Sequence, residues 1–270
     1  MMRFAVSILP APLLNTPDFR AVFGGIHGGA LKKDGVGLVR ELEMIALPGS
    51  TFVIHQDMGD NILRVSTQAY PVSEYDKLYA DSRFLKLTDK KPAPPVLNIP
   101  PLADVADRLY EANGSRYIWG GNWKAGLPQM LEYYPPSSSD ADIEYWTLKG
   151  VDCSGLLYEA MDGSCPRNTS MLIDYGSVVD IEGLSTKQII AKAKPLDYVV
   201  WPGHIVIFIE PDKIIQSRHN PLNQHSRHPD GVYIEDAQTV LEELCGGKKP
   251  VNTYPDKTIG GMFVMRRIFN

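Results

Sequence analysis

An amphipathic helix that begins at a cysteine is predicted by the sequence Val151-Asp152-Cys153-Ser154-Gly155-Leu156-Leu157-Tyr158-Glu159-Ala160-Met161. Asp152 is a natural N-cap, and apolar residues follow it at the spacing of a buried helical face. Cys153 would therefore lie in the first turn, where backbone N–H groups and the helix dipole favour the thiolate by about 0.3–2 kcal/mol. A thiol with a pKa of about 8.5 still needs a base to act as a nucleophile near neutral pH. The alternative is that Cys153 is a small buried hydrophobe.

Composition limits the class of protein. The chain has 270 residues, 44% of them hydrophobic and 22% charged, which predicts a globular protein of two modest domains rather than one. The net charge is −5, and adjacent basic residues occur only as short pairs such as Arg266-Arg267, so we expect no nucleic-acid partner. Three cysteines do not make a disulfide framework, which favours a reducing compartment or an exposed free thiol.

The beginning of the chain predicts a strand and not an export signal. It has one positive charge and an apolar run that Pro10 and Pro12 cut short, without a clear small-residue cleavage site. No run reaches the roughly 18–20 apolar residues of a membrane span. We therefore expect no membrane partner and a cytoplasmic location, with the cell envelope as the alternative.

Residues 1–89 predict a small all-β barrel, because short β-type runs alternate with Gly and Pro. These runs are 3–9, 38–46, 51–56, 62–67 and 84–87. A hairpin-like turn with a central glycine is expected at 56–61. Residues 90–101 are rich in proline and should run extended. We therefore expect a first domain at 1–89, a linker at 90–101 and a second domain at 102–270.

The second domain mixes helices and strands. Apolar spacing predicts helices at 102–110, at the cysteine stretch, at 185–193 and at 234–244. Two strands joined at Pro202-Gly203 are expected over 197–209, with further strands at 213–217 and 262–269. The long loop 124–150 contains Tyr133, Tyr134, Tyr145 and Trp146. Its aromatic rings either roof a cleft or belong to a plain surface insertion.

His204 is the candidate base for the cysteine. It stands at the beginning of an apolar strand, directly after a glycine that allows close approach of the backbone. If this strand packs against the helix of Cys153, the imidazole can take the thiol proton. The alternative is a strand-end histidine that binds a backbone carbonyl.

Three motifs, in this order, resemble the NlpC/P60 family of cysteine peptidases: Tyr117-Ile118-Trp119-Gly120-Gly121, then Asp152-Cys153-Ser154-Gly155-Leu156, then Asp197 followed by Gly203-His204-Ile205. The resemblance covers about residues 102–220. It implies an α+β fold in which a papain-like domain sets the cysteine helix against an antiparallel sheet. It also implies hydrolysis of peptidoglycan stem peptides, most often between γ-D-glutamate and a diamino acid, without a cofactor. Residues 1–89 more weakly resemble the SH3-like β-barrel that precedes this domain in enzymes of stem-peptide recycling.

The resemblance assigns the catalytic roles. Cys153 would be the nucleophile, His204 the base and Gln216 the residue that orients the base. This third position is commonly His in the family, and sometimes Asn or Gln. A Gln carbonyl can accept the second N–H of the imidazole, but it brings no negative charge to stabilise imidazolium.

The resemblance also implies the residues that bind substrate, a peptide such as L-Ala-γ-D-Glu-diamino acid. Asp152 would bind the free amine of L-alanine, together with Glu41 and Tyr70, for which Glu43 and Tyr75 are near alternatives. Ser154 and Thr169 would hold the D-glutamate α-carboxylate. Tyr117 would donate to the substrate or to the oxyanion, and the first-turn N–H groups would complete the oxyanion hole.

Other functions stay open. The Gln at position 216 favours a catalytically lapsed module that binds wall peptide, and intact Cys153 and His204 weigh against it. The same pair also suits an acyltransferase or amidase with another substrate, and Asp152 favours the peptide. His219, His225 and His228 lack an accompanying group of Cys or His at ligand spacing, so we expect no metal site. Cys165 and Cys245 are expected to be structural.

Overall fold

The computed structural model describes residues 3–24, 30–73, 76–139, 141–220 and 230–269. The chain forms two compact units. Unit 1 contains residues 1–97, 116–152 and 220–226, and unit 2 contains residues 98–115, 153–219 and 227–270. The segment 116–152 thus packs with the N-terminal strands. The domain limits expected from the sequence stay a prediction.

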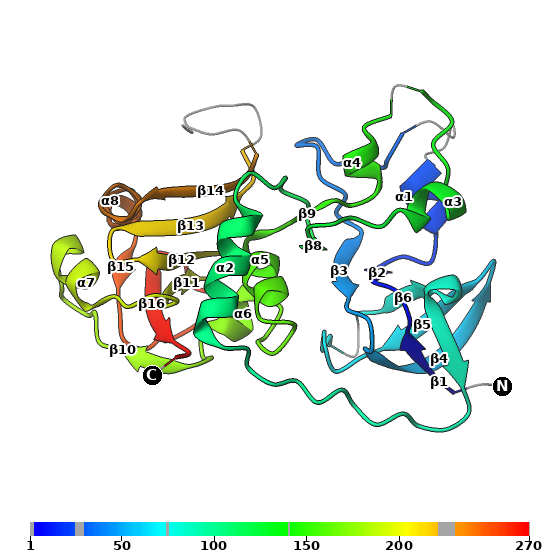
Figure 1. Cartoon of the computed structure of the whole chain (residues 1–270), viewed down its shortest axis with the longest axis horizontal. Helices are drawn as coiled ribbons and strands as arrows, with labels where there is room; N and C mark the ends of the chain where they lie inside the picture. Colours follow the sequence, from blue (N-terminus) through cyan, green and yellow to red (C-terminus); the bar gives the residue numbers. More distant parts are fainter. Residues whose placement is uncertain (1–2, 25–29, 74–75, 140, 221–229, 270) are drawn as a thin grey trace. The chain divides into compact units, whose positions relative to one another are not determined.

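Unit 1 is built on one antiparallel sheet of seven strands, in the order β3-β2-β6-β5-β4-β1-β7 (Figure 1). The strands are β1 (Phe4–Ser7), β2 (Ala11–Leu14), β3 (Leu42–Ala46), β4 (Thr51–Gly59), β5 (Ile62–Ser66), β6 (Leu78–Asp81) and β7 (Leu85–Thr88). Within the described residues, no pairing of β3 with β7 closes this sheet. The sequence therefore predicts the β-rich character of this unit, but the closed barrel is not found.

Two strands and one turn of unit 1 differ from the sequence prediction. All residues of β2 and β6 are buried, so neither strand shows the alternation of apolar and polar residues by which strands are recognised. The turn expected over 56–61 is shorter, because β4 continues to Gly59. Asp60 and Asn61 form it with φ of 50° and 67°, as a two-residue hairpin turn of type I′ requires.

The segment 116–152 completes the core of unit 1. It contains β8 (Asn122–Trp123), α3 (Gln129–Tyr133), α4 (Ile143–Trp146) and β9 (Gly150–Val151). The ring of Tyr134 packs on Phe19 and Phe23 of α1 (Phe19–Gly24), and its hydroxyl donates to the buried Asp81 at 2.6 Å. Trp146 is also buried and donates to the carbonyl of Tyr134 at 2.7 Å. These two rings therefore belong to the core of unit 1.

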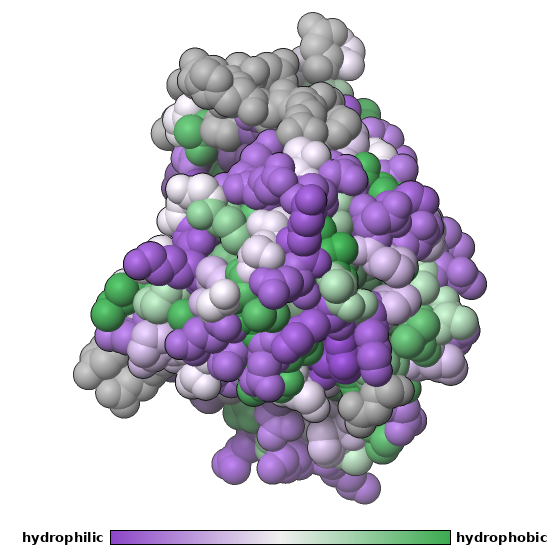
Figure 2. Space-filling model, turned by 90° about the vertical axis from the view of Figure 1, so that its left-hand side faces the viewer, coloured by the Kyte–Doolittle hydropathy of each residue, from purple (hydrophilic) through white to green (hydrophobic). Residues whose placement is uncertain are grey.

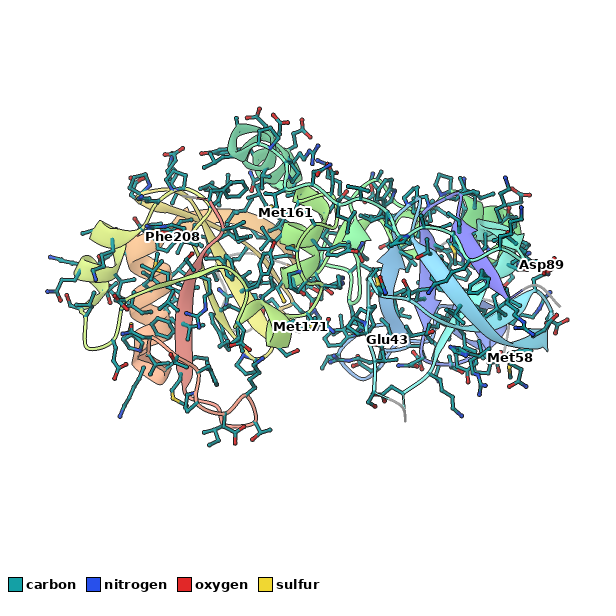
Figure 3. The ribbon with its side chains drawn as sticks, turned by 90° about the horizontal axis from the view of Figure 1, so that it is seen from below. Glu43, Met58, Asp89, Met161, Met171 and Phe208 are labelled. Carbon is teal, nitrogen blue, oxygen red and sulfur yellow. The ribbon has the colours of Figure 1, made fainter. Side chains whose placement is uncertain are left out.

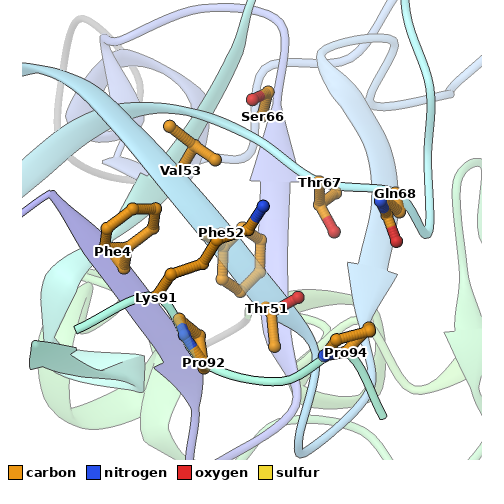
Figure 4. Close-up of a pocket in the computed structure, with 10 residues that line it drawn as sticks. All are labelled: Phe4, Thr51, Phe52, Val53, Ser66, Thr67, Gln68, Lys91, Pro92 and Pro94. Carbon is orange, nitrogen blue, oxygen red and sulfur yellow. The ribbon is translucent and has the colours of Figure 1, made fainter. Parts of the chain in front are cut away.

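The proline-rich segment borders a cavity of unit 1 (Figure 4). Lys91, Pro92 and Pro94 enclose about 310 Å³ with residues of β1, β4 and β5, among them Phe4 and Phe52. None of the residues that the sequence analysis assigns to the site lines this cavity.

Unit 2 contains a second sheet, with strands in the order β10-β16-β11-β12-β13-β14, all antiparallel, and β15 beside β16 (Figure 1). The strands are β10 (Ser177–Val179), β11 (Tyr198–Trp201), β12 (His204–Glu210), β13 (Lys213–Arg218), β14 (Gly231–Asp236), β15 (Lys249–Pro250) and β16 (Met262–Arg267). The helices are α2 (Leu102–Ala112), α5 (Cys153–Ala160), α6 (Thr169–Leu172), α7 (Thr186–Lys192) and α8 (Ala237–Gly247).

Helices cover both sides of this second sheet (Figure 1). On one side, Phe208 of β12 (Figure 3) and Ile214 of β13 form a core with Leu241 of α8 and Ile189 of α7. The outer surface on this side is mostly hydrophilic (Figure 2). On the other side, α5 packs on α2 and contacts β12 and β13. The helix that begins at Cys153 is thereby held against the strands that carry the predicted base.

Most elements expected in unit 2 are confirmed, including α2, α5, the hairpin of β11 and β12, and β13 and β16. α7 begins with a capping box of Ser185 and Gln188. The helix expected over 234–244 begins only at Ala237, because β14 continues to Asp236, which caps α8 through the N–H of Thr239 at 2.8 Å. Among the described residues, no helix is both long and apolar enough to cross a membrane.

Candidate active site

Cys153 is the first residue of α5, and its side chain is buried. Its thiol donates to the carbonyl oxygen of Gly203 at an Sγ–O distance of 3.7 Å. Gly203 lies in the turn between β11 and β12 and has φ of 97°, a conformation that suits glycine. The nucleophile predicted from the sequence therefore lies beside the turn from which His204 begins β12.

His204 and Gln216 are joined by a side-chain hydrogen bond of 2.8 Å between Nε2 and Oε1. Since an amide oxygen only accepts, the imidazole donates through Nε2–H, and Nδ1 is the nitrogen that can accept a proton. Trp201, which pairs with His204 across the hairpin, packs its ring on the imidazole at a centroid distance of 5.2 Å. The structure thus brings together the base and the residue expected to orient it.

Glu235 is a further member of this chain of hydrogen bonds, and the sequence analysis missed it. Its Oε2 accepts from Nε2 of Gln216 at 2.5 Å. Glu235 pairs with Ile214, which lies two residues before Gln216 in β13. The side chains of Glu235, Ile214 and Gln216 therefore lie on the same face of the sheet. The residue was missed because the sequence places it inside a helix instead of a strand.

The hydroxyl oxygens of Ser154 and Thr169 each accept one hydrogen bond. Nη1 of the buried Arg167 donates to Ser154 Oγ at 2.9 Å, and the N–H of Gly203 donates to Thr169 Oγ1 at 3.1 Å. The guanidinium of Arg167 also brings a positive charge next to Ser154, which suits an anion. Arg167 is a second functional candidate that sequence reasoning missed. The sequence feature that could have indicated Arg167 is its position two residues before Thr169, which was already a candidate.

Tyr117 and Asp152 both lie in unit 1, and both are buried. The residues on either side of Tyr117 bind the backbone of Val151 at 3.1 and 3.4 Å. The N–H of Asp152 donates to the carbonyl of Gly121 at 2.9 Å. The first motif of the resemblance therefore holds the segment that ends at Asp152.

The same motif is fixed to the edge of β3. A Cβ atom on Gly120, whose φ is 69°, would lie 2.4 Å from the carbonyl oxygen of Leu42, so this close approach requires glycine. The buried Asn122 accepts from the N–H of Ile45 at 2.9 Å and donates to its carbonyl at 2.7 Å. These two bonds pair an edge strand that would otherwise leave backbone groups unsatisfied.

The structure brings Tyr70 to Glu43, the alternative acid, and not to Glu41. The Tyr70 hydroxyl donates to Glu43 Oε2 at 2.7 Å, and Asn15 donates to the other carboxylate oxygen at 2.8 Å (Figure 3 labels Glu43). Glu41 forms an ion pair with Lys32 at 2.6 Å. The other alternative, Tyr75, lies outside the described residues.

The remaining polar residues that the sequence analysis singled out lie in other surroundings. Asp197 is buried and accepts two hydrogen bonds from Arg267, at 2.6 and 2.7 Å, which is a structural role. His219 binds Asp230 at 2.8 Å, and His225 and His228 lie outside the described residues. Within the part of the chain that the structure describes, no group of three or more His, Cys, Asp or Glu residues could hold a metal ion.

No family model and no curated protein matches the sequence. The structure is similar to a solved NlpC/P60 family protein from Bacillus cereus, with 14% identity, a TM-score of 0.45, and coverage of 85% of this chain and 98% of that one. It is also similar to NlpC2 from Trichomonas vaginalis, with 13% identity, a TM-score of 0.32, and coverage of 100% and 74%. RipD from Mycobacterium tuberculosis, a non-catalytic NlpC/p60 domain protein adapted to peptidoglycan binding, has 15% identity, a TM-score of 0.33, and coverage of 50% and 86%. All these TM-scores lie below 0.5, so the case for a function rests on the geometry of the site.

Proposed function

We propose that this chain is a cysteine peptidase of the NlpC/P60 type that hydrolyses peptidoglycan stem peptides. The observation that carries the proposal is the 2.8 Å hydrogen bond between Gln216 of β13 and His204, which directly follows the turn that contacts the Cys153 thiol. Nδ1 of the imidazole takes the thiol proton, and the thiolate attacks the scissile carbonyl. The imidazolium then protonates the leaving amine, and a thioester on Cys153 remains. Water, activated by the same imidazole, hydrolyses this thioester.

The surroundings of the thiol favour a substrate with a carboxylate next to the scissile bond. Ser154 directly follows the nucleophile, and its hydroxyl accepts a hydrogen bond from the positively charged guanidinium of Arg167. Thr169 accepts a hydrogen bond from the N–H of Gly203. The carbonyl of the same glycine accepts the hydrogen bond of the Cys153 thiol. A γ-D-glutamyl residue has a free α-carboxylate, so we propose that these groups bind it and that the γ-amide to a diamino acid is cleaved.

Unit 1 contains groups suited to an ammonium. Asp152 precedes the nucleophile, and Glu43 of β3, which accepts a hydrogen bond from Tyr70, is a second acidic residue. We propose that Asp152 and Glu43 bind the free amine of L-alanine, with Glu43 in the place first expected for Glu41. An enzyme that requires this amine suits the recycling of fragments already released from muramic acid. We propose also that unit 1 corresponds to the SH3-like domain that precedes the catalytic domain in these enzymes.

The test is incubation of the purified protein with L-Ala-γ-D-Glu-diaminopimelate, followed by mass analysis of the products. The proposal expects L-Ala-D-Glu and free diaminopimelate, no turnover by Cys153→Ala or His204→Ala, and a measurable remainder with Gln216→Ala. Binding of the peptide without turnover by the wild-type protein would instead identify a catalytically lapsed binding module.

A further inference from the structure

We propose that Glu235 is a positioning residue for the base: it sets the direction of the Gln216 amide and so fixes the imidazole of His204 in the form that can accept the thiol proton. This inference rests on the proposed function. It adds a residue beyond the nucleophile, the base and Gln216, and it acts without touching the substrate.

The geometry is a continuous chain of hydrogen bonds. Glu235 Oε2 accepts from Gln216 Nε2 at 2.5 Å, and Gln216 Oε1 accepts from His204 Nε2 at 2.8 Å. Gln216 is almost fully buried, with 3% of its surface exposed, so water offers its amide little alternative. The pairing of β13 with β14 places Glu235 opposite Ile214, on the same face as Gln216.

The direction of the amide decides which ring nitrogen carries the proton. A Gln side chain can turn by 180° and exchange its oxygen with its NH₂ group at little intrinsic cost. With the NH₂ group toward the ring, Nε2 of His204 would have to accept, and the proton would move to Nδ1. That tautomer cannot take a proton from Cys153 through Nδ1. An incorrect tautomer of a catalytic histidine lowers turnover by about 10⁴-fold in the serine proteases.

Glu235 removes this ambiguity because an ionised carboxylate only accepts hydrogen bonds. The NH₂ group of Gln216 must therefore face Glu235, and its oxygen must face His204. The carboxylate also supplies the negative charge that Gln216 lacks. It is separated by the Gln216 amide from the imidazolium that forms during attack. The chain His204-Gln216-Glu235 thus performs both tasks that a triad carboxylate performs alone.

The kinetic test is a charge exchange between the two positions. Glu235→Gln is expected to lower kcat by about tenfold, with KM unchanged, because one charge-assisted hydrogen bond is lost and no substrate contact is. Gln216→Glu alone is expected to be impaired, because two carboxylates would then face each other. The double variant Gln216→Glu/Glu235→Gln restores an acceptor toward the imidazole and a donor behind it, so its kcat should exceed that of either single variant. Glu182→Gln removes the same charge from an exposed position of unit 2 and should leave kcat unchanged.

A spectroscopic test does not depend on turnover. In Cys153→Ala protein labelled with ¹⁵N-histidine, at a pH where the imidazole is neutral, nitrogen chemical shifts show which nitrogen of His204 carries the proton. The expected result is Nε2–H with Glu235 and a mixture of tautomers after Glu235→Gln. An unchanged Nε2–H tautomer together with wild-type kcat in Glu235→Gln would overturn the proposal. If the wild-type protein cleaves no stem peptide, the proposed function fails, and the spectrum still decides the role of Glu235.

Discussion

Arg167→Met should abolish the discrimination between a substrate with a free D-glutamate α-carboxylate and one with an α-carboxamide. Arg167 is 3% exposed, and its guanidinium donates at 2.9 Å to Ser154, the residue after the nucleophile. A hydrogen bond to a charged partner contributes about 1.5–3 kcal/mol. Since each 1.4 kcal/mol is a factor of ten, the wild-type protein should prefer the carboxylate by about 10- to 150-fold in kcat/KM.

The assay compares kcat/KM for L-Ala-γ-D-Glu-diaminopimelate and its α-carboxamide in both proteins. Arg167→Met should hydrolyse the two peptides at similar rates, and Arg167→Lys should retain part of the preference, because it keeps the charge but loses the planar fork. Lys187→Met, an exposed position on α7, serves as the control for loss of a cation. A folded Arg167→Met protein with the full wild-type preference would refute the role of this guanidinium.

Three further predictions concern the amine, the thiols and the core of unit 1. N-acetylation of the substrate should lower kcat/KM by about a hundredfold or more, because a buried carboxylate then loses its partner charge, and Asp152→Asn should reduce this difference; equal rates for both peptides in the wild type would exclude an amine site. Iodoacetamide at pH 8 should modify Cys153 and not Cys165, because burial raises the pKa of the Cys165 thiol to about 12; peptide mapping that finds equal labelling would contradict this. Asn122→Ala should lower the free energy of unfolding by about 2–5 kcal/mol, because two buried backbone groups of β3 lose their partners; in urea titrations the exposed Asn98→Ala is the control, and equal stability of the two variants would disprove it.

The parts of the site that the sequence predicts are those that short local sequence patterns indicate. A cap before an apolar helix locates Cys153, and a Gly-containing turn between two apolar strands locates His204. Both signals lie within a few residues of the position that they predict. Gln216 was assigned only through the resemblance to the NlpC/P60 family, by its position in the strand after His204.

The parts that the sequence does not predict depend on contacts distant in the chain. Asn122 pairs with Ile45, 77 residues away, and this contact ties the segment 116–152 to unit 1. Glu235 was assigned to a helix because the apolar spacing from 234 to 244 continues across the end of β14. The choice between Glu41, just before β3, and Glu43 of β3 depends on which of the two faces Tyr70, and sequence spacing alone does not determine that.

The thioester on Cys153 can be detected by intact mass spectrometry of the protein quenched in acid during turnover of L-Ala-γ-D-Glu-diaminopimelate. If Cys153 is the nucleophile, a covalent L-Ala-D-Glu acyl adduct will map to Cys153 and will be absent from Cys153→Ala. Peptide hydrolysis that continues at the wild-type rate in Cys153→Ala, without any adduct, would contradict this role.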